Sequence, residues 1–370
     1  MKRKNIILIL MSLLFSTLTY TIVTKKHSLL SYVKKHFEKQ PYDSENNGLV
    51  FLLNKMQDQE GLIHSWVKYN KKSPDILLES MGQALEYVSL LGDQVLFSHY
   101  WESINKYFIA PEGYYFWQLD ENTKQGKYLS TAFIDDLRLA KALFIFKNYS
   151  DKYNKDLKIL ADRIYKFNLG KNQMPVDFYD GKVKAAAAEL SLFYIDVETL
   201  SNLANFDNKW EKPYEQAKNI LIHMPENQIG IYPQKYKLDS SEYFWQNNVN
   251  MVENLYTAIN AKNAGRSVEK FVAFLKKQIH YGHIFNHYSQ SGKPKNMSES
   301  VSVYALAARL FFLEKDYKNA HWCYDKVQSL QITIVNTLHG GFGDIWSGKI
   351  YAFNQLEALL MYRYLNTPNS

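Results

Sequence analysis

The chain has 370 residues, of which 46% are hydrophobic and 15% aromatic, which is enough apolar material to bury one extended core. Its formal net charge of +7 is spread over separate Lys residues without an Arg-rich block. This pattern argues against a nucleic-acid partner and suits contact with an anionic cell-wall or membrane surface. Cys323 is the only cysteine, so the sequence excludes an internal disulfide and a cluster of metal-binding thiolates.

The N-terminal segment has the pattern of a membrane anchor. Basic residues at 2–4 precede an uncharged, Ile- and Leu-rich stretch at 5–23, and two lysines follow. About 19 uncharged residues can just span a bilayer, whereas the core of a cleavable signal peptide has about 7–15. We expect residues 1–26 to be an uncleaved anchor with the body outside the cell; the alternative is a cleaved signal peptide and secretion. A polar stalk is expected over 27–47 and one folded domain over 48–370.

An aromatic- and glycine-rich loop precedes the start of an apolar helix six times along the chain. The spacing of about 50 to 60 residues indicates one repeated supersecondary unit. Apolar periodicity predicts twelve helices, near 48–58, 79–92, 94–107, 131–147, 151–167, 189–204, 208–222, 248–262, 267–280, 298–313, 316–332 and 351–365.

Short links alternate with the long aromatic loops, so the helices pair as six hairpins. Six hairpins packed side by side close into an all-α (α/α)6 toroid, in which the loops meet at one mouth and form small β-hairpins. An open α-solenoid is the alternative fold, although its repeats are normally shorter.

Acidic residues lie at or near the heads of the expected inner helices. A carboxylate in the first turn of a helix is ordinary, because the helix dipole and free amides favour it. Glu79 differs in its surroundings, since it lies between an apolar pair and Gly82, and partial burial would raise its pKa as a general acid requires. The other acids of this set are Asp135, Asp136, Glu189, Glu253 and Glu299.

Two segments resemble the signatures of glycoside hydrolase family 8. These are Glu79-Ser-Met-Gly-Gln83 and Ser130-Thr-Ala-Phe-Ile-Asp-Asp-Leu-Arg138, and the related family 126 and exopolysaccharide hydrolases of Gram-positive bacteria share this looser version. The resemblance implies an (α/α)6 barrel and an inverting polysaccharide hydrolase. Glu79 would be the proton donor and Asp136 would hold hydroxyls of the sugar, while Asp135 would do the same or cap its helix. The family's glutamate directly precedes Gly-Gln, and that position holds Met81 here, which cannot donate a proton.

The general base is expected on a late loop. The family places an aspartate there in an Asp-Ala-x-Arg context, which this chain lacks, and the nearest acid is Asp239. Asp177, Asp180 and Asp196 are reserve candidates. An inverting pair of carboxyls stands about 6.5–9.5 Å apart, with water between base and sugar. Rings that could stack on sugars are Tyr115, Trp117, Tyr179, Tyr194, Trp245 and Trp346.

No metal or cofactor is expected. His283 and His287 have an i, i+4 spacing but no third ligand, and no nucleotide-binding or Ser-His-Asp motif is present. The sequence thus predicts a monomeric, extracellular glycoside hydrolase that cleaves an exopolysaccharide or cell-surface glycan. The alternatives are a non-catalytic glycan-binding or biosynthesis-accessory protein, and a polysaccharide lyase or sugar epimerase on the same fold.

Overall fold

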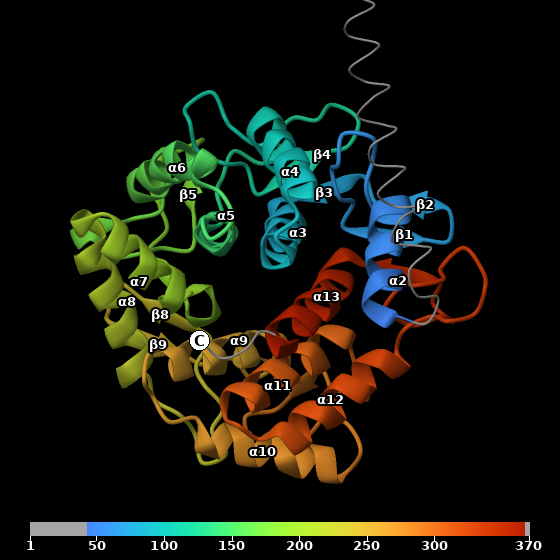
Figure 1. The fold of residues 1–370 in the computed structure, drawn as a ribbon. Helices are drawn as coiled ribbons and strands as arrows, with labels where there is room; N and C mark the ends of the chain where they lie inside the picture. The colour runs from blue at the N-terminus through green and yellow to red at the C-terminus, as the bar shows by residue number, and fades with distance from the viewer. Residues whose placement is uncertain (1–42, 367–370) are drawn as a thin grey trace, which may run out of the picture.

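Helices of the computed structural model, which describes residues 43–366, alternate between an outer and an inner ring (Figure 1). The inner helices are α3 (Leu78–Leu91), α5 (Phe133–Phe146), α7 (Val197–Phe206), α9 (Met251–Asn263), α11 (Val301–Leu313) and α13 (Ala352–Asn366). The outer helices are α2 (Ser44–Phe51), α4 (Gln94–Tyr107), α6 (Asn154–Phe167), α8 (Glu211–His223), α10 (Glu269–His280) and α12 (Tyr317–Ser329). The predicted (α/α)6 toroid is confirmed.

Burial explains which helices form which ring. In α6, the buried residues recur at the helical period, and the opposite face carries charged residues exposed to solvent. In α11, every residue from Val301 to Phe311 is buried, so this helix is covered on all sides. A helix that is apolar all round can only be an inner helix of such a ring.

The link between α3 and α4 is short because a glycine ends the first helix and an aspartate begins the second. Gly92 ends α3 in the left-handed conformation with φ +67°, which glycine adopts without steric cost. The Asp93 carboxylate then accepts hydrogen bonds of 3.0 Å from the amides of Val95 and Leu96 and caps α4. One hairpin therefore turns within two residues.

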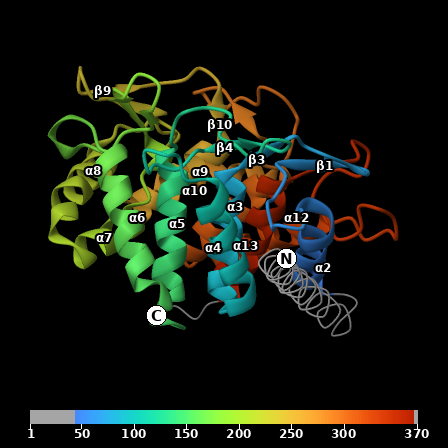
Figure 2. The ribbon, with the colours of Figure 1, turned by 90° about the horizontal axis from the view of Figure 1, so that it is seen from above.

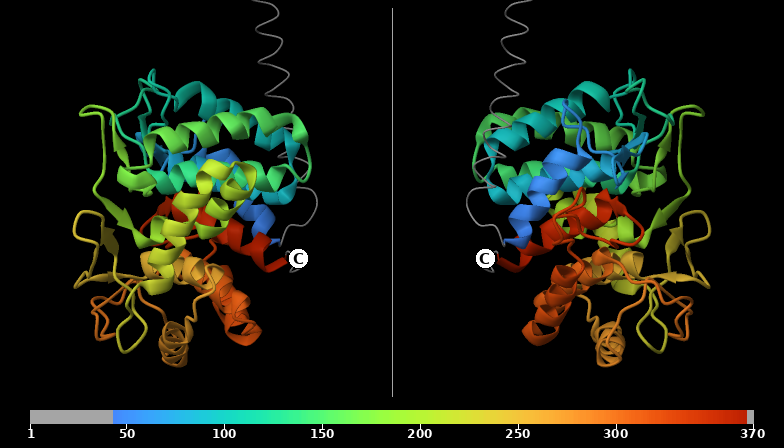
Figure 3. Two further views of the ribbon diagram at one scale, coloured as in Figure 1. Left: turned by 90° about the vertical axis from the view of Figure 1, so that its left-hand side faces the viewer. Right: turned by 90° about the vertical axis from the view of Figure 1, so that its right-hand side faces the viewer.

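Small antiparallel sheets gather along one edge of the ring, where the long loops meet (Figures 2 and 3). Some of the strands pair as hairpins within one loop, and others pair between loops and fix one loop to a neighbour. The first and last loops pair through β1 and β12, with Trp66 opposite Tyr351, and this contact closes the ring. The sheets are β12-β1-β2, β3-β4, β5-β6, β7-β8-β9 and β10-β11. Their strands are β1 (Trp66–Lys68), β2 (Lys71–Lys72), β3 (Asp75–Leu77), β4 (Gln118–Asp120), β5 (Tyr179–Asp180), β6 (Ala185–Ala186), β7 (Glu189–Ser191), β8 (Lys235–Lys237), β9 (Glu242–Phe244), β10 (Val249–Asn250), β11 (His287–Tyr288) and β12 (Lys349–Tyr351).

Several helix boundaries differ from the prediction by three residues or more. Glu189 lies on β7 instead of a helix, and α7 begins only at Val197, because the Asp196 side chain caps it by accepting from the Thr199 amide at 3.1 Å. The helix expected from residue 298 begins at Val301. The first helix starts earlier than expected, at Ser44, and continues as a π-helical turn over Leu52–Met56.

The membrane anchor predicted for residues 1–26 and most of the stalk lie outside the described residues. Between residues 43 and 366, no helix is both long and apolar enough to cross a membrane.

Candidate active site

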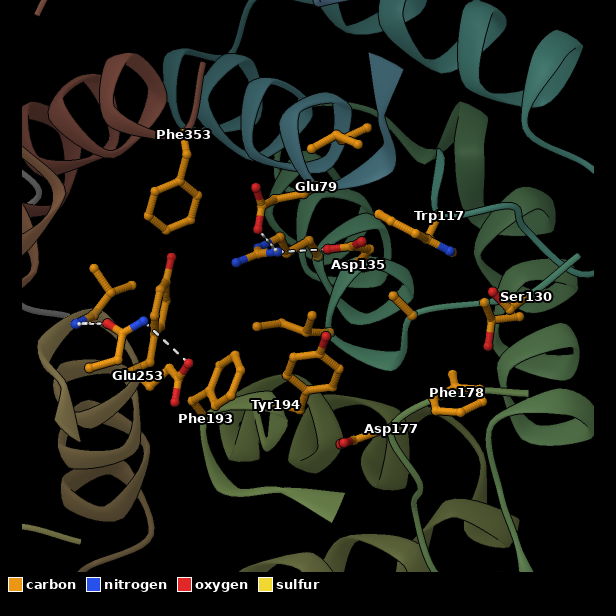
Figure 4. A pocket seen from close by; sticks show the side chains of 18 residues that line it. Glu79, Trp117, Ser130, Asp135, Asp177, Phe178, Phe193, Tyr194, Glu253 and Phe353 are labelled. Carbon is orange, nitrogen blue, oxygen red and sulfur yellow. Dashed lines mark hydrogen bonds and ion pairs between the residues drawn. The ribbon is translucent and has the colours of Figure 1, made fainter. Parts of the chain in front are cut away.

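A cavity of about 510 Å³ opens among the loops at the N-terminal ends of the inner helices (Figure 4). This size falls in the range of about 300–1,000 Å³ that is usual for small-molecule sites. Four carboxyl groups and one guanidinium line the cavity, and the rest of the lining is largely aromatic and aliphatic. The lining residues that matter below are Glu79, Trp117, Asp135, Arg138, Asp177, Phe178, Phe193, Tyr194, Asn250, Glu253, Tyr256 and Phe353.

One wall of the cavity carries two acids that share a guanidinium. Glu79 stands in the first turn of α3, directly after β3, and its side chain is 33% exposed to the cavity. An Arg138 terminal nitrogen donates to Asp135 at 2.7 Å and lies 3.9 Å from the nearer Glu79 oxygen. Gly82 makes this arrangement possible, because a Cβ at that position would lie 3.0 Å from the Arg138 Cβ. The absence of a side chain at Gly82 therefore makes room for Arg138.

Both acids on this wall hold their protons more tightly than exposed carboxyls do. Burial raises the pKa of Glu79, and nearby Glu357 adds to the effect, while Arg138 opposes it. Burial also raises the pKa of Asp135 to about 7, against the opposing effect of Arg138. The two carboxyls lie beside one guanidinium and titrate as a coupled pair.

The opposite wall presents Glu253 from the first turn of α9 (Figure 4). Its two oxygens accept from separate amides, one from Asn250 at 3.2 Å and one from Gln234 at 3.1 Å. Burial raises the pKa of Glu253, and the two hydrogen bonds oppose that rise because they stabilise the carboxylate. Asn250 also caps α9 by accepting from the Val252 amide at 2.9 Å, so helix capping fixes the position of the donor.

Asp177 is the fourth acid of the cavity, and its hydrogen bonds fix the neighbouring strand. Its two oxygens accept from the Ser191 amide at 2.5 Å and the Ser191 hydroxyl at 2.8 Å, and the Lys235 ammonium is 3.7 Å away. Burial raises the pKa of Asp177, and these contacts oppose the rise. The carboxylate therefore holds the end of β7 against the preceding loop.

Two of the predicted aromatic residues face the cavity. Trp117 lines it and stacks on Tyr128, with ring centroids 5.4 Å apart and planes 10° from parallel, and Tyr194 lines it from the far side. Tyr115 is instead buried, and its hydroxyl accepts from Arg163 at 3.0 Å. Trp245 packs against the core, and Trp346 is 90% exposed on a loop away from the cavity.

Several of the candidate acids do not line the cavity, namely Asp136, Asp239, Asp180, Asp196, Glu189 and Glu299. Asp136 is buried beside Asn168 at 2% exposure and is not part of the lining, and burial raises its pKa well above the ordinary value. Asp239 is exposed in the turn between β8 and β9, outside the lining. Spacing along the chain could not show that these acids miss the cavity. Asp136 is next to Asp135 on a helix, where adjacent residues face different directions, and Asp239 lies at the tip of a hairpin, which points away from the base of the hairpin.

The cavity also contains residues that the sequence did not single out. Phe178, Phe193, Tyr256 and Phe353 contribute rings, and Arg138 contributes the cation. Tyr256 follows Glu253 by three residues on the same helix, and Arg138 follows Asp135 by three, so helical spacing is the signal that could have found both. No group of three or more His, Cys, Asp or Glu side chains within residues 43–366 is arranged to hold a metal ion.

The fold and this site can be compared with known proteins. No family model matches the chain. YdaJ of Bacillus subtilis (strain 168), whose name marks it as a candidate lipoprotein, is 25% identical over 328 residues, which cover 86% of each chain. Among solved structures, an alpha-amylase from Clostridium perfringens has a TM-score of 0.80 at 23% identity and covers 88% of this chain and 99% of its own.

More distant structures share the fold as well. PssZ from Listeria monocytogenes has a TM-score of 0.70 at 19% identity, covering 85% of this chain and 93% of its own. A cold-adapted family 8 xylanase has a TM-score of 0.63 at 14% identity over 82% of each chain. The chain therefore has the (α/α)6 fold of family 8-like glycoside hydrolases. A D-mannose isomerase has this fold too, with a TM-score of 0.65 at 11% identity over 90% of this chain and 97% of its own, so the activity must be argued from the site.

Proposed function

We propose that the chain is a glycoside hydrolase that cleaves a polysaccharide by inversion. The observation that carries the proposal is the placement of Glu79 and Glu253 on opposite walls of one aromatic-lined cavity, each with a raised pKa. Inverting hydrolysis needs two carboxyls on opposite sides of the bond, about 6.5–9.5 Å apart, with space for a water molecule beside one of them. Trp117 and Tyr194 supply faces against which a sugar ring can stack.

Glu79 acts as the general acid. Its carboxyl proton passes to the glycosidic oxygen as the bond from that oxygen to the anomeric carbon breaks. Arg138 donates to Asp135 at 2.7 Å and stands 3.9 Å from Glu79, so the guanidinium stabilises negative charge more strongly on Asp135. We therefore place the proton that this pair shares on Glu79, and Asp135, instead of Asp136, meets the hydroxyls of the sugar.

Glu253 acts as the general base. Its carboxylate takes a proton from a water molecule whose oxygen attacks the anomeric carbon from the face opposite the leaving group. The Asn250 and Gln234 amides hold this carboxylate in place without adding a positive charge that would suppress its basicity. Asp177 suits this role less well, because the Lys235 ammonium lies 3.7 Å from its carboxylate and stabilises the negative charge, in addition to the two hydrogen bonds from Ser191.

The expected substrate is an exopolysaccharide or cell-surface glycan outside the cell, reached by a chain that the N-terminal segment anchors to the membrane. The uncharged stretch at 5–23 supports this placement, and so does the name of the relative YdaJ. The working form in this proposal is a monomer that needs no cofactor.

The test is hydrolysis of the producer's own exopolysaccharide, with a panel of α- and β-glucans and xylans beside it. We expect the wild type to release reducing ends, and Glu79→Gln and Glu253→Gln to lower kcat by about 10²–10⁴-fold each, as loss of a general acid or base does. Asp239→Asn is the matched control and should keep full activity, because this acid is exposed away from the cavity.

Proton NMR of the first-formed anomer completes the test. Inversion is expected, and a retained configuration would overturn the mechanism. If Glu79→Gln keeps the activity of the wild type, Glu79 is not the general acid. If Asp177→Asn is inactive while Glu253→Gln is active, the general base is Asp177 instead of Glu253. Binding of a glycan without any product would identify a glycan-binding protein instead.

A further inference from the structure

A second cavity, of about 340 Å³, lies toward the C-terminal ends of the inner helices. Asn263, Leu313 and Leu365 line it from the last turns of α9, α11 and α13, so it is displaced along the ring axis from the loops. The two cavities share the lining residues Ile134, Arg138, Phe193 and Tyr256, which form the partition between them. The proposed hydrolysis uses nothing on the far side of this partition.

Two cations in the second cavity, Lys141 and Arg309, are ion-paired but donate no hydrogen bond to any residue among 43–366. The nearest carboxylate oxygens to the Lys141 ammonium belong to Glu86 and Asp196 at 3.6 Å and Glu198 at 3.8 Å, all beyond hydrogen-bond distance. The Arg309 guanidinium is 3.5 Å from Glu357, and the structure records no hydrogen bond from it to any of residues 43–366. The Arg309 side chain is only 9% exposed, and Lys141 only 14%. No nitrogen of Lys141 or Arg309 is among the fully buried side-chain atoms without a partner, so these donors are open to the cavity.

The acids around the cavity do not need these donors. Glu86 accepts from the Tyr364 hydroxyl, and Asp196 accepts from the Thr199 hydroxyl at 2.8 Å and from its amide. Glu198 is more than half exposed and is therefore hydrated. Positive and negative side chains in the lining are equal in number, so the cavity has no excess of positive charge. What it offers a ligand is N–H groups of Lys141 and Arg309 that donate to no acceptor in the described part of the chain.

Lys141 and Arg309 lie close enough to bind one ligand. Both approach the ring of Tyr364, with the Lys141 nitrogen 5.3 Å and the Arg309 guanidinium carbon 4.0 Å from its centroid. The neighbouring acids raise the pKa of Lys141 well above its ordinary value, so it stays an ammonium ion. Asn260 and Asn263 add amide groups that can bind hydroxyls.

We propose that this second cavity binds a small sugar bearing an anionic group, either a carboxylate or a phosphate, whose oxygens accept from Lys141 and Arg309. Hydrogen bonds between an oxyanion and these cations are the strong, charge-assisted kind. The volume suits a monosaccharide, since sites for small molecules begin at about 300 Å³. The proposal is independent of the reaction in the first cavity.

Isothermal titration calorimetry of the full chain with D-glucuronate, glucose 6-phosphate and neutral glucose tests the proposal. At least one anion should bind about ten-fold more tightly than glucose, and the tighter of the two identifies the carboxylate or the phosphate as the preferred group. Lys141→Gln should weaken that binding about ten-fold or more. Lys147→Gln is the matched control, an exposed lysine at the end of the same helix α5, and should bind within about two-fold of wild type.

A second variant covers the case in which Lys141→Gln does not fold. Asn263→Phe narrows the second cavity without removing a charge and without touching the first, and it should weaken anion binding as well. The proposal fails if neither anion binds at about 10 mM, where even a Kd of about 1 mM would nearly saturate the site. It fails equally if glucose binds as tightly as both anions, or if Asn263→Phe binds the anion as the wild type does.

Discussion

At the loop end of the ring, four carboxyl groups face a cavity whose one cation is Arg138, which lines both cavities. At the other end, Lys141 and Arg309 are added, and they face acids that already accept hydrogen bonds or are hydrated. Burial acts on the two sets in different ways. At the loop end, burial raises the pKa values of the carboxyl groups, because too few cations are near to stabilise their charged forms. These groups can then donate and accept protons at moderate pH. At the other end, the cations surrounded by acids stay charged, so they can bind an anion but cannot transfer a proton. One end is therefore suited to proton transfer and the other to holding an anion.

The partition between the two ends is held by a buried acid of α13. Glu357 is fully buried and accepts from Gln83 of α3 at 2.6 Å and from the Tyr256 hydroxyl of α9, and Arg309 of α11 lies 3.5 Å away. Four inner helices meet at this one carboxylate. Its loss should therefore affect both cavities, which makes it the most severe test of their separation.

The largest expected effect is the loss of stability in Glu357→Leu. Removing one partner of a buried ion pair leaves the other charge uncompensated, which costs about 3–5 kcal/mol. Chemical denaturation should show this loss. The double variant Glu357→Leu/Arg309→Met should be less destabilised than the sum of the two single variants, because no unpaired charge remains. A single variant that loses less than about 1 kcal/mol would contradict the assignment of Glu357 as the structural centre.

A smaller effect is expected at the aromatic wall of the loop end. Trp117→Ala should lower kcat/KM about ten-fold or more, since truncating a buried aromatic anchor often costs over 1 kcal/mol of binding and about 1.4 kcal/mol is a factor of ten. Trp346→Ala is the control. That ring is 90% exposed away from the cavity, so its loss should leave kcat/KM unchanged. Steady-state kinetics on a soluble oligosaccharide would measure both, and equal losses would mean that the substrate extends well beyond the cavity.

The contrast between Trp117 and Trp346 also shows how far sequence reasoning reaches. Helical periodicity and the sixfold repeat predict the toroid, because each hairpin repeats the same local physics. The signature-like segments likewise placed Glu79 and Asp135 on one wall of the cavity. Both tryptophans lie in aromatic loops before inner helices, but only tertiary structure determines which loop folds over the mouth.

The same limit explains why the sequence did not single out Glu253, the proposed general base. Glu253 occupied an ordinary first-turn position, where a helix dipole alone would account for an acid, and Asp239 occupied the expected loop. What distinguishes Glu253 is Gln234, which is 19 residues away in the sequence and reaches it only after β8 has paired with β7. A pairing between loops of different repeats is a long-range contact, which the local pattern of residues does not encode.

That contact gives the smallest of the expected effects, a shift in the pH profile. Glu253 must be ionised to act as a base, so activity should fall at low pH as the carboxylate is protonated, above the ordinary Glu value of about 4.3 because burial raises its pKa. Gln234→Leu removes a donor that stabilises the carboxylate, so the pKa should rise further and the acidic limb should move to higher pH. A hydrogen bond to a charged group is worth about 1.5 kcal/mol and one pKa unit about 1.36 kcal/mol, so the shift should be about one pH unit.

Profiles of kcat/KM against pH for wild type and Gln234→Leu would measure this shift. Gln246→Leu serves as the control, since that residue lies near the same segment but does not line the cavity. The basic limb should stay in place in both variants, because it reports the acid on the far wall, which Gln234 does not contact. A shift of the basic limb instead would mean that Gln234 acts on the coupled pair of Glu79 and Asp135, and the two walls could then no longer be treated as separate acid and base.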